Sequence, residues 1–163
     1  LKNDPKERAE NIMIVDLMRN DLSKIAKKGS VNVNELCEVY TYKTVHQMVS
    51  TISCDLKEGK SFTDILRATF PMGSMTGAPK IKAMQLIEEY EEFKRGLYSG
   101  SIGYISPNGD FDLNVIIRTL IYNANLRTLS CGVGSAITIQ ADAEKEYAEC
   151  GIKVQKILDG ISG

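Results

Sequence analysis

Apolar and polar positions from Asp4 to the region of Asp21–Ala26 follow the pattern of an α-helix. Asp4 can cap the free amides of a first turn, and Pro5 lacks the amide that the first helical position would leave unpaired. The apolar residues that follow surround most of the helix, as in a helix buried within its protein: Ala9, Ile12, Met13, Ile14, Val15 and Leu17. We expect this helix to end between Asp21 and Ala26.

The pattern changes at residue 31 to β-branched and aromatic residues in partial alternation. Residues 31–56 are therefore expected to form extended strands. Two shorter helical patterns follow, Phe62 to Phe70 and Ile81 to Tyr90, and a glycine-containing stretch joins them.

The second half of the chain combines hairpin signals with one more helix. Pro107-Asn108-Gly109-Asp110 separates the apolar segments 101–106 and 111–122, which predicts a β-hairpin. A turn at 125–127 and a strand over 128–139 come next. A 3.6-residue apolar period predicts a helix from Ala143 to Ile161. Helices and hairpins in this order predict an α+β fold with layered antiparallel sheets and flanking helices.

Composition narrows the class of protein. The 163 residues suffice for one domain with a core, and 43% hydrophobic with 25% charged residues is ordinary for a soluble globular protein. A net charge of −1 gives no electrostatic basis for binding nucleic acid or a membrane. The four cysteines lack metal-ligand spacing, which favours reduced thiols and a cytoplasmic location. Because the chain starts at Leu1 without an initiator methionine, we expect it to be a fragment of a longer protein.

The stretch from Phe70 to Lys80 has the residues of an anion-binding loop. Glycines let a backbone approach a ligand closely, and free amides at a helix start favour a negative charge. Ser74 and Thr76 add hydroxyl donors beside those amides. A carboxylate or phosphate cradle explains these residues, and a tight turn between two helices explains them equally well.

Pairs of acids lie in the first and last predicted helices. Glu7 and Glu10 are three residues apart, as are Glu146 and Glu149, with Lys153 four residues further on. Glu10 shares a face with apolar side chains, so it needs a cation or a hydrogen-bond partner if that face is buried. From the pattern alone, acids in a first turn complement the helix dipole, and the last group is a solvated face of ion pairs.

Other polar residues have two interpretations each. His46 is the only histidine, and a lone histidine is more often structural than catalytic. Arg118 is a charge within an apolar strand pattern, which favours binding of a ligand carboxylate over an internal ion pair. Tyr98 by itself indicates core packing. Residues 132–136 are small enough for their amides to reach a carboxylate, and a bulge or tight bend is the alternative.

Several of these motifs together resemble one family. Gly-Ser-x-Thr-Gly-Ala-Pro-Lys at 73–80 and Asp-Leu-x-Arg-Asn-Asp at 16–21 resemble signatures of chorismate-utilising enzymes that add ammonia. The two Glu-x-x-Glu pairs resemble two halves of one site in that family. The resemblance implies that Glu10 and Glu149 bind Mg²⁺, with Glu7 and Glu146 supporting them, and that the ion holds the ring carboxylate of chorismate. It covers residues 1–163, but only the C-terminal part of the family's catalytic domain, which has an anthranilate synthase component I-like fold.

The resemblance also implies the remaining roles. His46, Val49 and Ser50 match a His-x-x-Val-Ser context in which the histidine assists departure of the C4 hydroxyl of chorismate. The substrate contacts that it implies are Ser74, Tyr98, Arg118, Gly134, Ser135, Ala136 and Lys153. Ser135 and Ala136 stand where glycines are common in the family, which reduces the clearance for a ligand.

Within the family, the motifs at 73–80 and 100–104 are more similar to the aminodeoxychorismate synthases than to the anthranilate synthases. This similarity implies replacement of the C4 hydroxyl by ammonia, giving 4-amino-4-deoxychorismate for para-aminobenzoate and folate, with ammonia from a glutamine amidotransferase subunit. The alternatives are anthranilate synthase component I and a catalytically inert chorismate-binding fragment. The family's lysine nucleophile motif, Pro-Ile-Lys-Gly-Thr, and its upstream general-acid glutamate do not occur here. We therefore expect the fragment alone to be inactive.

Overall fold

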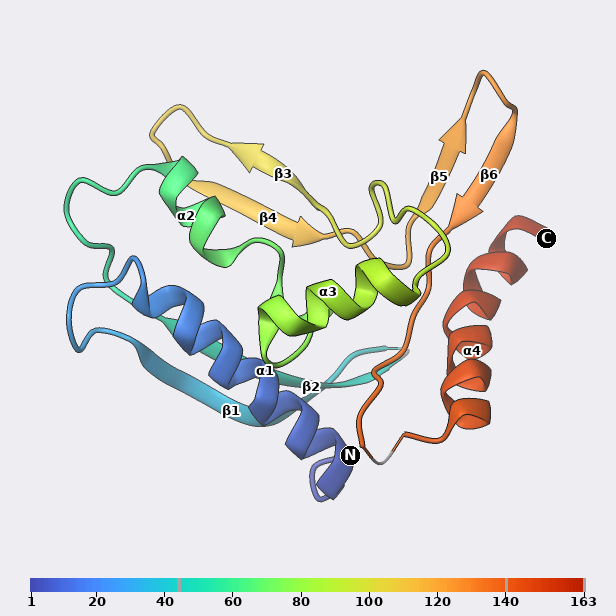
Figure 1. Ribbon diagram of the computed structural model, residues 1–163, viewed down its shortest axis with the longest axis horizontal. Helices are drawn as coiled ribbons and strands as arrows, with labels where there is room; N and C mark the ends of the chain where they lie inside the picture. The colour runs from blue at the N-terminus through green and yellow to red at the C-terminus, as the bar shows by residue number, and fades with distance from the viewer. Residues whose placement is uncertain (44, 140, 163) are drawn as a thin grey trace. The chain divides into compact units, whose positions relative to one another are not determined.

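The computed structural model describes residues 1–43, 45–139 and 141–162, and it divides into two compact units, Leu1–Glu92 and Phe93–Gly163. Figure 1 labels the helices and strands in chain order. Within these residues the strands form three two-stranded sheets, and each sheet is antiparallel. The predicted α+β class is therefore confirmed, while the assignment of 1–163 to one catalytic domain stays a prediction.

Helix α1, Pro5–Ser23, begins and ends where the sequence predicts. The Asp4 side chain accepts hydrogen bonds from the amides of Lys6 (2.9 Å) and Glu7 (3.1 Å), which caps the first turn. The expectation of a helix buried on all sides is wrong. Val15 and Asp21 are the buried residues of α1, and Ile12 is 38% exposed.

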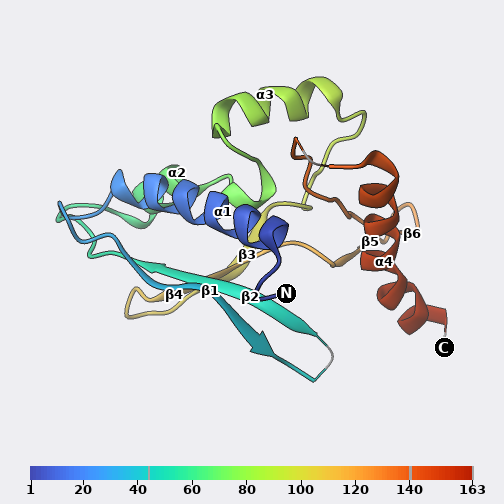
Figure 2. The same ribbon diagram turned by 90° about the horizontal axis from the view of Figure 1, so that it is seen from below.

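Strands β1 (Asn32–Thr41) and β2 (His46–Ser53) form an antiparallel hairpin that pairs Thr41 with His46 at its turn end. The register shifts between Glu35 and Glu38, where the buried Cys37 has a positive φ of 55°. Helix α1 runs along one face of this hairpin (Figure 2) and contacts both strands. This packing places residues of α1 over residues of β2.

Two further helices and the glycine loop complete the first unit. Helix α2, Phe62–Thr69, has a capping box in which Ser61 and Asp64 bond each other's backbone. A short 3₁₀ turn, η1, spans Gly73–Met75, and α3 spans Lys80–Tyr90. Both predicted helices are confirmed, and the connection between them is a folded loop.

The second unit contains two hairpins and a long helix. β3 (Ser101–Ile105) pairs with β4 (Phe111–Val115), and β5 (Leu120–Asn123) pairs with β6 (Thr128–Cys131). Helix α4 spans Ala143–Ser162. Two expected strands are shorter than predicted: 111–122 is interrupted at 116–119, and 128–139 ends at Cys131. In the part of the chain described here, no helix has the length and apolar character needed to cross a membrane.

Candidate functional site

The glycine loop, residues 72–78, is held tightly by its own polar groups and by α1. The Thr76 hydroxyl donates to the carbonyls of Met72 (3.1 Å) and Gly73 (3.3 Å), so it serves the loop itself. A Cβ atom on Gly73 would lie 3.1 Å from Cβ of Leu17 on α1. Ser74, by contrast, is exposed. Of the two hydroxyls predicted to face a ligand, only that of Ser74 is therefore presented at the surface of this unit.

Sequence reasoning missed the partner of Lys80, the last residue of the loop motif. Its ammonium forms an ion pair with Asp21, which is only 2% exposed near the end of α1. Lys24 Nζ also lies 2.9 Å from Oδ1 of this carboxylate. The sequence does show an acid at the end of the 16–21 motif and a lysine at the end of the 73–80 motif. The two residues are 59 positions apart, so the sequence gives no indication that they are in contact.

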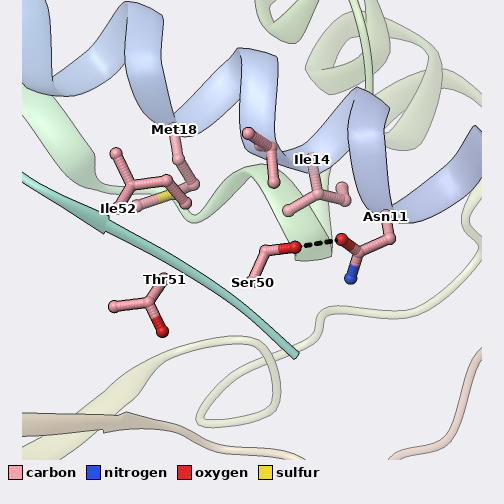
Figure 3. A pocket seen from close by; sticks show the side chains of 7 residues that line it. Asn11, Ile14, Met18, Ser50, Thr51 and Ile52 are labelled. Carbon is pink, nitrogen blue, oxygen red and sulfur yellow. Dashed lines mark hydrogen bonds between the residues drawn. The ribbon is translucent and has the colours of Figure 1, made fainter. Parts of the chain in front are cut away.

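A cavity of about 340 Å³ lies between α1 and β2, and Figure 3 shows the side chains that line it. Asn11, from α1, accepts a hydrogen bond from the Ser50 hydroxyl of β2. Ser50 in turn accepts from the amide of Cys37 (2.9 Å). Ser50 of the predicted His-x-x-Val-Ser motif is therefore bonded to the residue next to Glu10.

Glu10 is half-buried on α1, with 26% of its side chain exposed, and Lys6 Nζ lies 3.9 Å from its Oε1 atom. Glu7 is exposed one turn earlier, in the first turn of the helix. Glu10 is thus the less exposed acid of the pair, as expected for an acid that shares a face with apolar residues.

His46 is the exposed first residue of β2. Its Nδ1 atom lies 3.0 Å from the hydroxyl of Thr41, its cross-strand partner. The contact with Nδ1 leaves Nε2 as the ring nitrogen for a reacting group. The predicted catalytic role of His46 stays a prediction.

Further along β2, Thr51 belongs to a polar cluster on the exposed part of the hairpin. Glu35 accepts hydrogen bonds from the hydroxyls of Thr51 and Tyr40, each at 2.6 Å. These bonds lower the pKa of Glu35, first through Thr51 and then through Tyr40, and they raise the pKa of Tyr40. Because the cluster is exposed, we assign it to the surface of the hairpin and not to the site.

In the second unit, Tyr98 lies against the small residues of 132–134. A Cβ atom on Gly132 would overlap the Tyr98 ring, and one on Gly134 would lie 2.8 Å from the Tyr98 hydroxyl. Arg95 stands over the same ring, with its guanidinium carbon 5.9 Å from the ring centre. Both glycines are thus explained by close approach to Tyr98, a residue that the sequence alone assigned to core packing.

Helix α4 contacts the same small-residue segment through two residues that lie about two turns apart, Glu146 and Lys153. The Ser135 hydroxyl donates to Glu146, which is only 5% exposed. Lys153 donates to the carbonyl of Gly134 (2.9 Å) and forms an ion pair with Glu149 (2.7 Å). The structure therefore joins six predicted site residues of this unit in one cluster, which we call the α4 cluster: Tyr98, Gly134, Ser135, Glu146, Glu149 and Lys153.

Arg118 does not lie in the strand that the sequence predicted. It lies in the connection between β4 and β5, is exposed, and has a left-handed φ of 49°. Among the residues described, no ion pair to Arg118 is present. The predicted strand position is wrong because the strand breaks at 116–119, and the internal ion pair offered as its alternative does not form. Ala136 follows the α4 cluster and is exposed.

The carboxylates of both units suit a hard divalent cation. No group of three or more histidine, cysteine, aspartate or glutamate side chains gathers as a metal site in 1–43, 45–139 or 141–162. Glu10 and Glu149 each form an ion pair with a lysine four residues away on the same helix. Carboxylate oxygens are ligands that Mg²⁺ accepts when water and other oxygen donors complete the coordination.

Comparisons with known proteins agree with these motifs. The family model described as chorismate binding enzyme matches residues 1–159. The chain is 48% identical over 158 residues to "Aminodeoxychorismate synthase component 1" of Escherichia coli (strain K12), covering 97% of this chain and 34% of that protein. It is 43% identical over 161 residues to "Anthranilate synthase component 1" of Aquifex aeolicus (strain VF5), covering 99% of this chain and 32% of that protein.

A solved structure shows the same fold. Anthranilate synthase component I from Streptococcus pneumoniae TIGR4 matches with a TM-score of 0.80 and 38% identity, over 94% of this chain and 35% of that one. The antiparallel hairpins, the flanking helices and the two acid-bearing helices thus define a part of an anthranilate synthase-like catalytic fold. The chain belongs to the chorismate binding enzyme family. It spans about a third of the length of these three proteins.

Proposed function

We propose that the complete protein containing this chain aminates chorismate at C4, as component I of an aminodeoxychorismate synthase. The observation that carries the proposal is the α4 cluster, in which Tyr98, the 134–135 backbone and the acids of α4 meet. Membership of the family supports chorismate as the substrate. The 48% identity to a relative of that name supports the C4 reaction.

Chorismate is a dianion, so its recognition requires cations and amide donors. Arg118 can give a carboxylate two parallel hydrogen bonds from a planar fork, and no protein carboxylate occupies it among the residues described. Lys153 and the small-residue segment offer further donors beside Tyr98. In this proposal Ser74 contacts the substrate from the glycine loop, and the exposed Ala136 contacts it beside the small-residue segment.

The proposed cofactor is Mg²⁺, which Glu10 and Glu149 would hold, with Glu7 and Glu146 as supporting acids. When bound, the ion would supply positive charge for the ring carboxylate of chorismate. Lys6 and Lys153 now contact these two acids, so binding of the cation requires those ammonium groups to move away. The Ser135 hydroxyl keeps Glu146 oriented towards the small-residue segment 132–136.

The proposed role of His46 is to give a proton to the departing C4 oxygen, so that hydroxide leaves as water while ammonia takes its place. Thr41 contacts Nδ1, which leaves Nε2 for this proton transfer. Ammonia would come from a separate glutamine amidotransferase subunit, in keeping with the "component 1" in the name of the relative. The cytoplasmic location expected from the sequence stays a prediction.

Anthranilate synthase component I is the second candidate, because a relative of that name is 43% identical and a structure of that name superposes with a TM-score of 0.80. The test is to incubate the complete protein with chorismate, ammonium and Mg²⁺ and to separate the products by chromatography. We expect 4-amino-4-deoxychorismate. Anthranilate with equimolar pyruvate would establish the second candidate, and binding of chorismate without any product would establish an inert binding protein.

A further inference from the structure

A buried carboxylate near the end of α1 is paired with lysines from two directions. Asp21 is 2% exposed, and its oxygens meet Lys24 Nζ at 2.9 Å and the ammonium of Lys80. A buried carboxylate is costly unless a cation compensates it. Lys24 is a helix neighbour with 54% of its side chain exposed, whereas the side chain of Lys80 is 16% exposed. Lys80 is therefore the better-buried of the two cations.

The position of Lys80 is unfavourable for its own helix. It is the first residue of α3, where the helix dipole disfavours a positive charge. Helix α3 has no side-chain cap and no acid in its first turn to offset that charge. A lysine at this position therefore does not stabilise α3. The interaction that favours it is the ion pair with Asp21.

The two ends of the glycine loop are therefore both attached to α1. At its start, Gly73 packs so closely on Leu17 that a Cβ atom would lie 3.1 Å away. Just after the loop, Lys80 at the start of α3 reaches Asp21, which lies four residues after Leu17 on α1. Between these points, Thr76 closes the loop on its own carbonyls. Loosening either end allows the loop to move relative to α1, which also carries Glu10.

We infer that Asp21 and Lys80 are positioning residues that hold the glycine loop on α1 in the conformation that presents Ser74 at the surface of this unit. The inference rests on the proposed function for its consequence in catalysis. A loop displaced by about 1 Å no longer places the Ser74 hydroxyl correctly for the substrate, an effect on the reaction of up to about a hundredfold. Because the pair does not touch the reacting atoms, its loss should raise the KM for chorismate more than it lowers kcat.

The experiment compares four variants of the complete protein: Asp21→Asn, Lys80→Met, the double variant, and Asp16→Asn as control. Asp16 forms an exposed ion pair with Arg19 on the same helix (3.0 Å). Its replacement therefore removes the same kind of ion pair from α1 without affecting an attachment of the glycine loop. Amide hydrogen exchange of residues 72–78 reports on the loop, and steady-state kinetics report on substrate binding. The double variant carries no uncompensated buried charge, so it remains informative if a single variant does not fold.

We expect exchange of the loop amides to increase by about tenfold or more in Lys80→Met and in the double variant, with a similar rise in KM. The double variant should be no worse than the worse single variant, because both changes remove one interaction. Asp16→Asn should change neither quantity. Unchanged loop exchange, or unchanged KM, in folded variants overturns the inference. A wild-type protein that neither binds nor converts chorismate would instead contradict the proposed function. In that case, the comparison of loop exchange between the wild type and the variants still tests whether Asp21 and Lys80 hold the loop on α1.

Discussion

Arg118 and Arg127 both have left-handed backbone conformations, with φ of 49° and 50°, and both are exposed. They differ in their surroundings: Arg127 lies in the tight turn between β5 and β6, whereas Arg118 lies in the connection between two hairpins. A left-handed conformation is uncommon in a residue that is neither glycine nor asparagine. Where such a conformation does occur, it is frequently at a functional site. The pair therefore offers a test of the predicted anchor with a matched control.

We predict that Arg118→Lys in the complete protein weakens chorismate binding by about 1.5–3 kcal/mol, the usual value for a hydrogen bond to a charged group. Lysine keeps the charge but loses the planar fork that fits a carboxylate. Isothermal titration of chorismate measures the change, and Arg127→Lys should leave affinity as it is. Loss of thermal stability with unchanged affinity would show that Arg118 is structural.

A second prediction at this scale concerns Asp64 in the capping box of α2. The backbone N–H of Ser61 and then its hydroxyl hold the pKa of Asp64 below 3.8. A lowered carboxyl pKa stabilises the folded state above the unfolded pKa, and this contribution disappears as the pH falls through the folded pKa. Ser61→Ala should therefore raise the pKa of Asp64 part of the way towards 3.8 in an NMR titration. Thr63→Ala, an exposed hydroxyl on the same turn, should not, and an unmoved Asp64 pKa in Ser61→Ala contradicts the assignment.

At the scale of elements, the contact between the glycine loop and α1 depends on the absence of a side chain at Gly73. A Cβ atom there would lie 3.1 Å from Leu17 Cβ and 3.3 Å from Leu17 Cδ1, so the loop and the helix have to separate slightly. Gly151, in the interior of α4, has no heavy atom within 4 Å of the corresponding position in the described chain. Two alanine substitutions should thus have opposite effects.

We predict that Gly73→Ala destabilises the complete protein by about 1–3 kcal/mol, the usual effect of overpacking. Gly151→Ala should stabilise α4 by up to about 1 kcal/mol, because alanine loses less backbone entropy in a helix. Denaturant unfolding followed by circular dichroism measures both. Equal stability of Gly73→Ala and the wild type would mean that Leu17 yields without cost and that the contact does not fix the loop.

At the scale of the whole molecule, the metal prediction concerns two acids that lie far apart in the sequence, Glu10 on α1 and Glu149 on α4. We predict that Glu10→Gln or Glu149→Gln raises the Mg²⁺ concentration for half-maximal activity by at least about tenfold and raises the KM for chorismate with it. The two quantities should change together because the ion would bridge the protein and the substrate. Mg²⁺ titrations at several chorismate concentrations provide the measurement.

The control for the metal prediction is Glu144→Gln, which removes an exposed acid from the first turn of α4 outside the α4 cluster. It should leave the Mg²⁺ titration unchanged. A titration that is also unchanged in Glu10→Gln and Glu149→Gln would eliminate both residues as ligands.

The last prediction is that residues 1–163 alone do not convert chorismate, even with ammonium and Mg²⁺. The chain contains neither the lysine nucleophile motif nor the partner glutamate of the family it resembles. Removing such a group lowers turnover by orders of magnitude. The assay compares folded, purified 1–163 with the complete protein. Turnover within about tenfold of the complete protein would place the catalytic residues inside this chain.

Much of the fold could be predicted because its elements begin and end with local chemistry. Asp4 and Pro5 start α1, and the Pro107–Asp110 turn joins β3 to β4, through hydrogen bonds and dihedral preferences of a few adjacent residues. The prediction of one strand through Arg118 was wrong. Apolar residues continue through 116–119, but in the structure the backbone of Ile116 bonds with Ser99 and Gly100, and Arg118 adopts a left-handed conformation. These backbone bonds join residues that are not adjacent in the sequence, so a local pattern does not reveal them.

The candidate site also has a part that the sequence could predict and a part that required the structure. The sequence by itself indicated the family and predicted which residues carry the chemistry, because acids, glycines and a lone histidine in fixed spacing match one family. Only the tertiary structure decided what each residue contacts: Lys80 meets Asp21, Tyr98 covers Gly134, and Ser135 binds Glu146. These pairs are 59, 36 and 11 residues apart in the sequence. Local sequence preferences do not report contacts between residues so far apart. The cost of an uncompensated buried charge and the volume of one Cβ atom matter only once the chain has folded.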